Sequence, residues 1–145
     1  MRVAIASDHG GFEQKQELAA FLTESGYEVM DFGPDNDESV DYPDFALLVA
    51  QAVAEERAER GVLVCGTGIG MAIAANKVAG IRAANVCTSE FAILAREHND
   101  ANIVSLSGRF VDLAANKTII SAFLETDFAQ GRHICRVEKI RQVEQ

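Results

Sequence analysis

The stretch GVLVCGTGIGMAIAA, residues 61–75, decides the fold of this chain of 145 residues. Its first part is apolar and β-branched, which is typical of a buried strand, and its last part has the small residues of a closely packed helix. Three glycines within residues 66–70 join the two parts. A strand, a tight glycine turn and a helix in this order predict one unit of a parallel α/β sheet.

The same alternation of strand and helix patterns continues along the whole chain. We expect strands at residues 2–6, 27–32, 61–65, 81–86 and 101–106, and helices at about 13–26, 69–78, 89–97 and 111–124, with one more after Asp41, which can cap it, and a last one from Ile134. Strands this apolar are typical of a sheet covered on both faces. The sequence therefore predicts an α/β fold with a single domain over residues 1–145, a Rossmann-like three-layer αβα sandwich around a five-stranded parallel sheet.

The composition excludes several classes of protein. A formal net charge of -9 argues against nucleic-acid or membrane-surface binding, because both need a surplus of clustered Lys and Arg. No segment has the roughly 18 uninterrupted apolar residues of a membrane span, and the first residues lack a secretory pattern, so we expect a cytoplasmic protein. The cysteines, Cys65, Cys87 and Cys135, are widely spaced without a CxxC pair, which predicts free thiols and no metal site.

Polar and glycine residues follow three of the predicted strands. They are SDHGG at 7–11, CGTGIG at 65–70 and SGR at 107–109. In an open parallel sheet, ligands bind beyond the carboxyl ends of the strands. The sequence therefore predicts that these three segments converge on one site.

The glycine turn does not match the known phosphate-binding motifs. A dinucleotide fingerprint needs a glycine where Met71 stands and an acidic residue after the next strand, which ends instead in Asn85-Val86-Cys87. A Walker loop would end in Gly-Lys-Ser/Thr, and a cysteine phosphatase loop would have arginine at position 71. These three interpretations are excluded.

Two interpretations of the turn remain. Its backbone N–H groups, uncovered at the glycines, can converge at a helix amino terminus and stabilise an anion. Such a turn would favour the thiolate of Cys65, and Thr67 could donate a hydrogen bond to that thiolate or to a substrate. Alternatively, Cys65 is a small buried residue that ends a strand, and the glycines permit close packing of helix and sheet.

Three further groups also have two interpretations each. Asp8 and His9 form either a turn that caps the first helix or part of the site. His98 either interacts with the negative end of a helix or belongs to a polar cluster with functional use. Arg132 and Arg136, one helical turn apart, either bind phosphate or form a solvated basic face.

The last predicted helix has an apolar side opposite the two arginines, and it can pack through this apolar side. This side consists of Ile134, Val137, Ile140 and Val143.

Five blocks of sequence together resemble one family. They are ASDHGGF (6–12), DYPDFA (41–46), CGTGIGMAIAANKVAGIRA (65–83), HNDANIVSLSGR (98–109) and GRHICRV (131–137). In order and spacing they are similar to ribose-5-phosphate isomerase of type B and the related allose- and galactose-6-phosphate isomerases. The resemblance covers nearly the whole chain and implies an aldose–ketose isomerase that uses no metal and no organic cofactor.

The resemblance also implies a role for each site residue. Cys65 would be the base that moves a proton between C1 and C2, with Thr67 beside it, and His98 would assist opening of the sugar ring. The enediolate oxygen would be held by the backbone of Gly66, Gly68, Ile69 and Gly70, sugar hydroxyls by Asp8, Tyr42 and Asn99, and the phosphate by His9, Arg109, Arg132 and Arg136. Relatives with serine at position 65 use a glutamate instead, so the thiol favours the cysteine mechanism.

The family's tail arginines reach the site of a neighbouring subunit. The resemblance therefore implies a homodimer, or a tetramer of two dimers, with contacts from the helix at about 134–144. We further expect Cys65 and His98 to share one concavity. The acidic loop 33–40 leaves the length of the sugar open. The alternatives to a pentose phosphate isomerase are an isomerase of a six-carbon aldose 6-phosphate and a noncatalytic subunit that binds sugar phosphates.

Overall fold

The computed structural model describes residues 1–144 and confirms the five-stranded parallel sheet. Its strands are β1 (Arg2–Ser7), β2 (Glu28–Asp31), β3 (Arg60–Cys65), β4 (Ala83–Asn85) and β5 (Ile103–Ser107). Their order across the sheet is β2-β1-β3-β5-β4. From β1 the chain continues to β2 on one side of the sheet, and from β3 it continues to β4 on the other side. The crevice between β1 and β3 is therefore the place where an open α/β sheet binds ligands.

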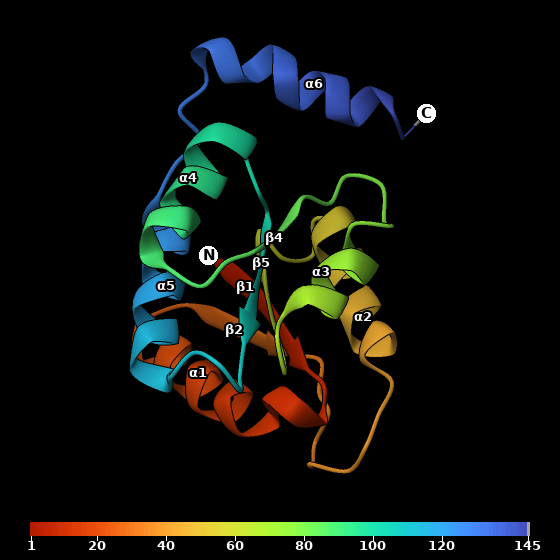
Figure 1. The fold of residues 1–145 in the computed structure, drawn as a ribbon, viewed down its shortest axis with the longest axis vertical. Coiled ribbons are helices and arrows are strands. Elements are labelled where there is room, and N and C mark those ends of the chain that lie inside the picture. Colours follow the sequence, from red (N-terminus) through yellow and green to blue (C-terminus); the bar gives the residue numbers. More distant parts are fainter. Residues whose placement is uncertain (145) are drawn as a thin grey trace.

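Helices cover both faces of the sheet and form the predicted three layers (Figure 1). On one face lie α1 (Phe12–Glu24), α4 (Ser89–Asn99) and α5 (Leu113–Glu125), and on the other lie α2 (Tyr42–Ala54) and α3 (Ile69–Ala75). Single turns of 3-10 helix, η1 (His9–Gly11) and η2 (Gly131–His133), precede α1 and the last helix, α6 (Ile134–Gln142). No helix in residues 1–144 is long and apolar enough to cross a membrane.

The alternation of side chains along the strands produces two cores. Val3 and Ile5 of β1 point toward α1 and α5, whereas Ala4 and Ala6 point toward α2. All four are completely buried. The small alanine side chains let α2 approach the sheet closely, which explains why a strand with few bulky residues still lies at the centre of the sheet.

Capping residues mark the starts of α2, α4 and α5 in the sequence, and two of the three side chains make the capping hydrogen bond. Thr88 and Asp112 each accept a hydrogen bond from a backbone N–H in the first turn of α4 and α5, at 3.2 and 2.8 Å. Asp41 occupies the cap position of α2, with Pro43 in the first turn, as predicted. Within residues 1–144, however, the Asp41 side chain makes no capping hydrogen bond.

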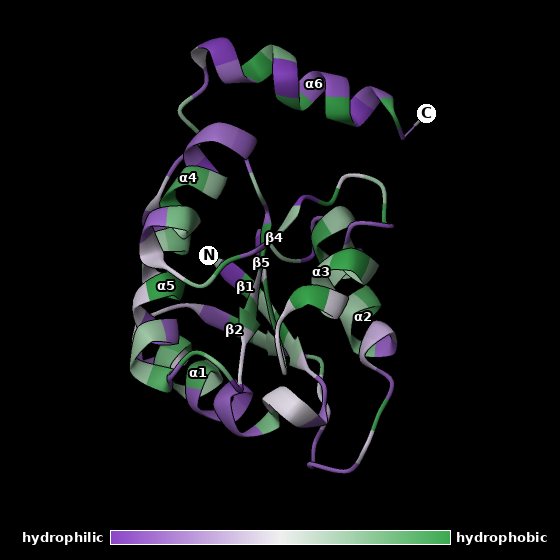
Figure 2. Cartoon of the chain, in the orientation of Figure 1, coloured by the Kyte–Doolittle hydropathy of each residue, from purple (hydrophilic) through white to green (hydrophobic). Residues whose placement is uncertain are grey.

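Helix α6 departs from the expectation that its apolar side packs. It lies across the end of the sheet at which α4 ends, and Figure 2 shows hydrophobic residues along it. Of these residues Val137 is buried, but Ile134 and Ile140 are about half exposed, at 50% and 47%, and Val143 is 84% exposed. The apolar side of α6 is therefore largely uncovered in a single chain.

Candidate active site

The three segments predicted to converge do so through backbone hydrogen bonds. The N–H of Asp8 donates to the carbonyl of Val64 at 3.2 Å, which ties the end of β1 to β3. The N–H of Gly108 donates to the carbonyl of Cys65 at 2.7 Å, and that of Arg109 donates to Gly66 at 3.2 Å. The carboxyl ends of β1, β3 and β5 thus meet at one edge, which we call the glycine-turn edge.

Cys65 ends β3 inside this edge. Its side chain is 5% exposed and packs in the core beneath α3, so the structural interpretation of the residue is correct in part. Its Sγ also accepts a hydrogen bond from the N–H of Gly68 at 3.1 Å. Gly68 has a φ of +83°, a left-handed conformation that glycine adopts without steric cost. The turn therefore directs an N–H group at the sulfur.

Thr67 does not bond to the sulfur in the described part of the chain. Its Oγ1 accepts a hydrogen bond from the N–H of Ile69 at 3.1 Å. The side chain is exposed, and its hydroxyl proton is not used in that bond. Of the two hydrogen bonds predicted for Thr67, only the one to a substrate remains open.

Arg109 and Asp8 lie beside the turn. A Cβ added to Gly66 would lie 3.3 Å from Nη1 of Arg109, so the guanidinium group covers the bare backbone of the turn. One carboxylate oxygen of Asp8 accepts a hydrogen bond from the N–H of Gly11 at 3.1 Å. Asp8 therefore caps η1, which is one of its two predicted roles.

His9 and Tyr42 join the same edge from two other segments. Nδ1 of His9 accepts a hydrogen bond from the N–H of Val40 at 3.3 Å, which holds the acidic loop beside the site. A Cβ added to Gly70 would lie 2.6 Å from the Tyr42 ring. Gly70 therefore permits a close approach of α3 to the first residue of α2.

The other predicted residues lie at the opposite edge of the sheet. His98 and Asn99 form the last turn of α4, which is longer than predicted. Just beyond them, the carbonyl of Asn102 accepts a hydrogen bond from the N–H of Gly61, at the start of β3. Cys65 ends that strand, about 13 Å further along at about 3.3 Å per residue.

The expectation that Cys65 and His98 share one concavity is therefore wrong for a single chain. The physical reason is the direction of α4. Because β4 and β5 are parallel, the helix between them must return the chain to the amino ends of the strands. Its last residues consequently lie far from the glycine turn.

His98 instead belongs to a second cluster, which we call the tail cluster. It lines a cavity of about 240 Å³ whose walls are His98, Asn99, Arg132, His133, Arg136, Val137 and Ile140. Burial, and then the positive charges of His98, Arg132 and Arg136, lower the pKa of His133 from its ordinary value. The four residues predicted to bind phosphate are thus divided, with His9 and Arg109 at one edge and both tail arginines at the other.

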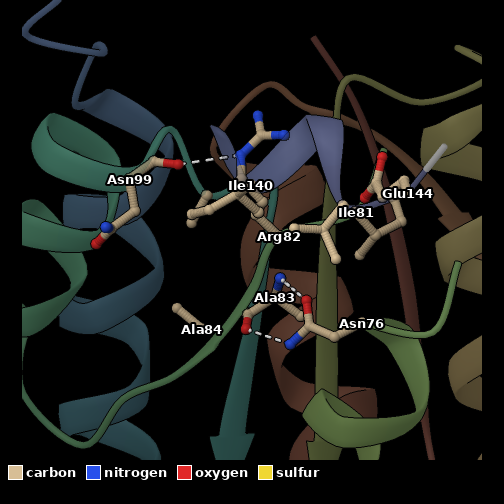
Figure 3. Close-up of a pocket in the computed structure, with 10 residues that line it drawn as sticks. Asn76, Ile81, Arg82, Ala83, Ala84, Asn99, Ile140 and Glu144 are labelled. Carbon is tan, nitrogen blue, oxygen red and sulfur yellow. Dashed lines mark hydrogen bonds between the residues drawn. The ribbon is translucent and has the colours of Figure 1, made fainter. Parts of the chain in front are cut away.

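A larger cavity of about 500 Å³ lies between α6, α3 and the start of β4 (Figure 3). Ile81, Ala84 and Ile140 make its walls mostly apolar, and Asn99 is the predicted site residue that reaches it. At the rim, the side chain of Asn76 bonds to both backbone groups of Ala83, at 2.9 and 2.7 Å. This cavity lies at the amino ends of the strands and belongs to the side of the tail cluster.

Four polar residues that contact the glycine turn or belong to the tail cluster have no individual role in the sequence-based prediction, although Ser107 lies in one of the three segments predicted to converge. Ser105, Ser107 and Asn85 each donate a side-chain hydrogen bond to a carbonyl of residues 66–68. A signal for the two serines exists, because they lie two positions apart in an apolar strand and so face the same side. His133 stands between Arg132 and Ile134 within a block that had been singled out, but it was not assigned a role.

Comparisons with known proteins show the family to which this chain belongs. The model of the family described as Ribose/Galactose Isomerase matches residues 3–140. Ribose-5-phosphate isomerase B of Escherichia coli is 46% identical over 145 residues, which cover 99% of this chain and 97% of that protein. The structure of ribose-5-phosphate isomerase B from Clostridium thermocellum has a TM-score of 0.98 at 52% identity and covers 99% of this chain and 97% of that one.

A third relative was solved with a ligand. The structure of ribose-5-phosphate isomerase B from Mycoplasma genitalium with bound ribulose 5-phosphate has a TM-score of 0.95 at 43% identity, and covers 99% of this chain and 95% of that one. Family model, sequence and fold all match over nearly the full length of the chain. The chain therefore belongs to the ribose/galactose isomerase family of enzymes.

Proposed function

We propose that this protein interconverts ribose 5-phosphate and ribulose 5-phosphate, with Cys65 as the base. The observation that carries the proposal is the hydrogen bond from the N–H of Gly68 to Cys65 Sγ at 3.1 Å, within a turn of bare backbone. The bond places an N–H donor at the atom that would accept the proton. The names of the relatives, and the ribulose 5-phosphate bound to the Mycoplasma genitalium enzyme, support a pentose phosphate as the substrate.

The proposed reaction moves one proton between two carbons. The thiolate of Cys65 removes the proton from C2 of the open-chain aldose, and the electrons of that bond move to the carbonyl oxygen on C1. In the resulting enediolate the proton of the C2 hydroxyl passes to the oxygen on C1, and the thiol of Cys65 returns its proton to C1. The electrons of the C1–C2 double bond form the new C1–H bond, and a carbonyl at C2 completes the ketose. Under this proposal, backbone N–H groups of residues 66–70 stabilise the negative charge that develops on oxygen, a contribution of about 3 kcal/mol per donor, and Arg109 binds the phosphate.

A complete site requires a second copy of the chain under this proposal. The tail cluster supplies His98, to assist ring opening, and Arg132 and Arg136, to bind phosphate, but it lies about 13 Å or more from Cys65 in one chain. In a two-fold dimer, the tail cluster of each copy can face the glycine-turn edge of the other, which makes two equal sites.

Exposed apolar residues support such a dimer. Ile69 and Ile73 of α3, next to the glycine turn, are 53% and 59% exposed, and Ile134 and Ile140 of α6 are about half exposed. Pairing α6 of one copy with α3 of the other would bury both sets, and apolar patches of this kind often mark contacts between proteins.

The base is tested with Cys65→Ala. We expect this variant to bind ribose 5-phosphate but to lose exchange of the C2 proton with solvent by a factor of about 10² to 10⁴. Cys87→Ala, which changes an exposed cysteine, is the control and should exchange at the normal rate. Unchanged exchange in Cys65→Ala would remove the assigned base, and the absence of exchange in the unmodified protein would favour a noncatalytic sugar-phosphate-binding subunit.

A second candidate substrate is a six-carbon aldose 6-phosphate. The family description, which joins ribose and galactose, is the observation that favours it. A comparison of kcat/KM for ribose 5-phosphate, allose 6-phosphate and galactose 6-phosphate decides between them. A higher value for either hexose phosphate would transfer the assignment to that sugar.

A further inference from the structure

Three successive carbonyl groups of the glycine turn are held by side-chain donors. All three donors lie outside the turn, at the ends of β4 and β5. The bonds join Ser107 Oγ to the carbonyl of Gly66 at 2.7 Å, Asn85 Nδ2 to that of Thr67 at 3.2 Å, and Ser105 Oγ to that of Gly68 at 2.6 Å. The carbonyl oxygens of Gly66, Thr67 and Gly68 are therefore held in fixed orientations, toward the side chains of β4 and β5.

The two serines are placed there by the alternation of β5. Ser105 and Ser107 follow Ile103 at intervals of two, on the same face as Cys65 and beneath α3. Their side chains are 0% and 1% exposed. A buried hydroxyl without a partner is unfavourable, so each serine stabilises the orientation of the turn in which it finds a carbonyl.

Asn85 completes the set from β4. Its amide nitrogen donates to the carbonyls of both Thr67 and Ser105, at 3.2 and 3.0 Å. A Cβ added to Gly68 would collide with this nitrogen. The glycine therefore provides the room that the asparagine needs to reach the turn.

The orientation of each carbonyl fixes the orientation of the next N–H. A trans peptide bond is planar, and its C=O and N–H point in opposite directions. Because the carbonyl of Thr67 points to Asn85, the N–H of Gly68 points away from it and meets Cys65 Sγ at 3.1 Å. In the same way, the carbonyl of Gly68 points to Ser105, and the N–H of Ile69 meets Thr67 Oγ1.

We propose that Asn85, Ser105 and Ser107 are positioning residues, which hold the carbonyls of the turn away from Cys65 so that the N–H of Gly68 faces its sulfur. The inference rests on the proposed role of Cys65 as the base. Gly66 and Gly68 have little steric restriction on their own backbone angles, so the peptide groups that they share with Thr67 could otherwise rotate. A rotated peptide would present a carbonyl oxygen to the sulfur in place of the N–H donor of Gly68.

The test measures the reactivity of Cys65 directly. In protein with Cys87→Ser and Cys135→Ser, the rate of alkylation by iodoacetamide is followed against pH, with and without Asn85→Ala or Ser105→Ala. We expect both variants to move the midpoint of this profile to higher pH and to lower kcat for ribose 5-phosphate about tenfold, the effect of one hydrogen bond, with KM little changed. Ser105→Thr, which keeps the hydroxyl, should restore the midpoint.

Asn76→Ala is the matched control. Asn76 is also an exposed asparagine whose side chain makes two backbone hydrogen bonds next to β4, but both go to Ala83 (Figure 3). Its loss should leave the midpoint and kcat unchanged. An equal shift in Asn76→Ala, or no shift in Asn85→Ala and Ser105→Ala, would overturn the inference. Failure of the unmodified protein to isomerise any sugar phosphate would instead overturn the proposed function. The alkylation profile of Cys65 does not depend on turnover, so the two failures can be distinguished.

Discussion

The imidazole rings of His98 and His133 stack on each other, with their centroids 4.4 Å apart and their planes inclined by 16°. This contact joins the last turn of α4 to η2, the short segment that leads into α6. The tail arginines, Arg132 and Arg136, lie on either side of His133 in the sequence. The stack brings them beside His98 in space. The stack therefore connects the position of the arginines to the protonation of a histidine.

The lowered pKa of His133 predicts a loss of stability in acid. Because the folded protein favours the neutral ring, the contribution of His133 is fully present above the ordinary pKa of 6.5 and is lost as the pH falls through the lowered folded value. Urea unfolding at about pH 7.5 and about pH 5.5 measures it. We expect His133→Asn to lose less unfolding free energy between the two pH values than the unmodified protein, and an equal loss in both would contradict this prediction.

The regular parts of the fold could be predicted because each strand and helix carries its own periodic pattern. The apolar run of β3 and the glycines after it indicated a parallel unit, and the rules for such units then placed the ends of β1, β3 and β5 together. Helix α6 shows the limit of this approach. Its apolar side indicates that Ile134 and Ile140 are suited to burial, but not that both remain about half exposed in a single chain.

Only those residues of the candidate site that follow parallel strands, and so lie at the same edge of the sheet, could be placed together from the sequence. Cys65 and Arg109 follow parallel strands, so topology brings them together. The position of His98 at the other edge was not predicted, because the helix pattern of residues 89–97 was not followed to the end of the sheet at which it returns the chain. Ser105 was missed, and Ser107 was predicted only as part of a segment that converges on the site, because a strand pattern is read from its apolar residues and the hydroxyls between them were not counted.

Hybrid dimers test whether the two edges come from different copies. Cys65→Ala and His98→Ala should each be nearly inactive alone. When the two are mixed under conditions that exchange subunits, half of the dimers become hybrids and each hybrid has one intact site, so about a quarter of the normal kcat should return.

A matched pair of variants provides the control for the hybrids. Cys65→Ala mixed with Thr67→Ala changes the same edge twice, so every site in the hybrid contains one defect. This mixture should recover no activity beyond the sum of its parts. Recovery here, or none in the first mixture, would contradict the shared site.

Arg136→Ala tests phosphate binding by the tail cluster. Loss of a charge-assisted hydrogen bond worth about 2 kcal/mol should raise KM for ribose 5-phosphate about 30-fold, with little effect on unphosphorylated ribose. Arg141→Ala is the control, because Arg141 lies on the same helix and its guanidinium contacts Glu138 and Asp100, at 3.6 and 3.9 Å. Equal changes for the two sugars would exclude a phosphate contact.

Gly68→Ala should be far more destabilising than Gly80→Ala, although both glycines have the same backbone conformation. Their φ angles are +83° and +85°, so an alanine at either position costs about 1 to 2 kcal/mol in backbone strain. At Gly80 a Cβ would meet nothing within 4 Å, whereas at Gly68 it would lie 2.9 Å from the backbone carbonyl of Leu106. Because β5 is completely buried there, the turn must move instead, at a further cost of about 1 to 3 kcal/mol.

The movement in Gly68→Ala would also carry the N–H of residue 68 away from Cys65 Sγ. We therefore expect kcat for ribose 5-phosphate to fall in this variant even at temperatures where it remains folded, and to stay normal in Gly80→Ala. Urea unfolding and steady-state kinetics of the two variants measure both effects. Similar unfolding free energies, or an unchanged kcat in Gly68→Ala, would show that the close fit between the turn and β5 does not control the geometry at the sulfur.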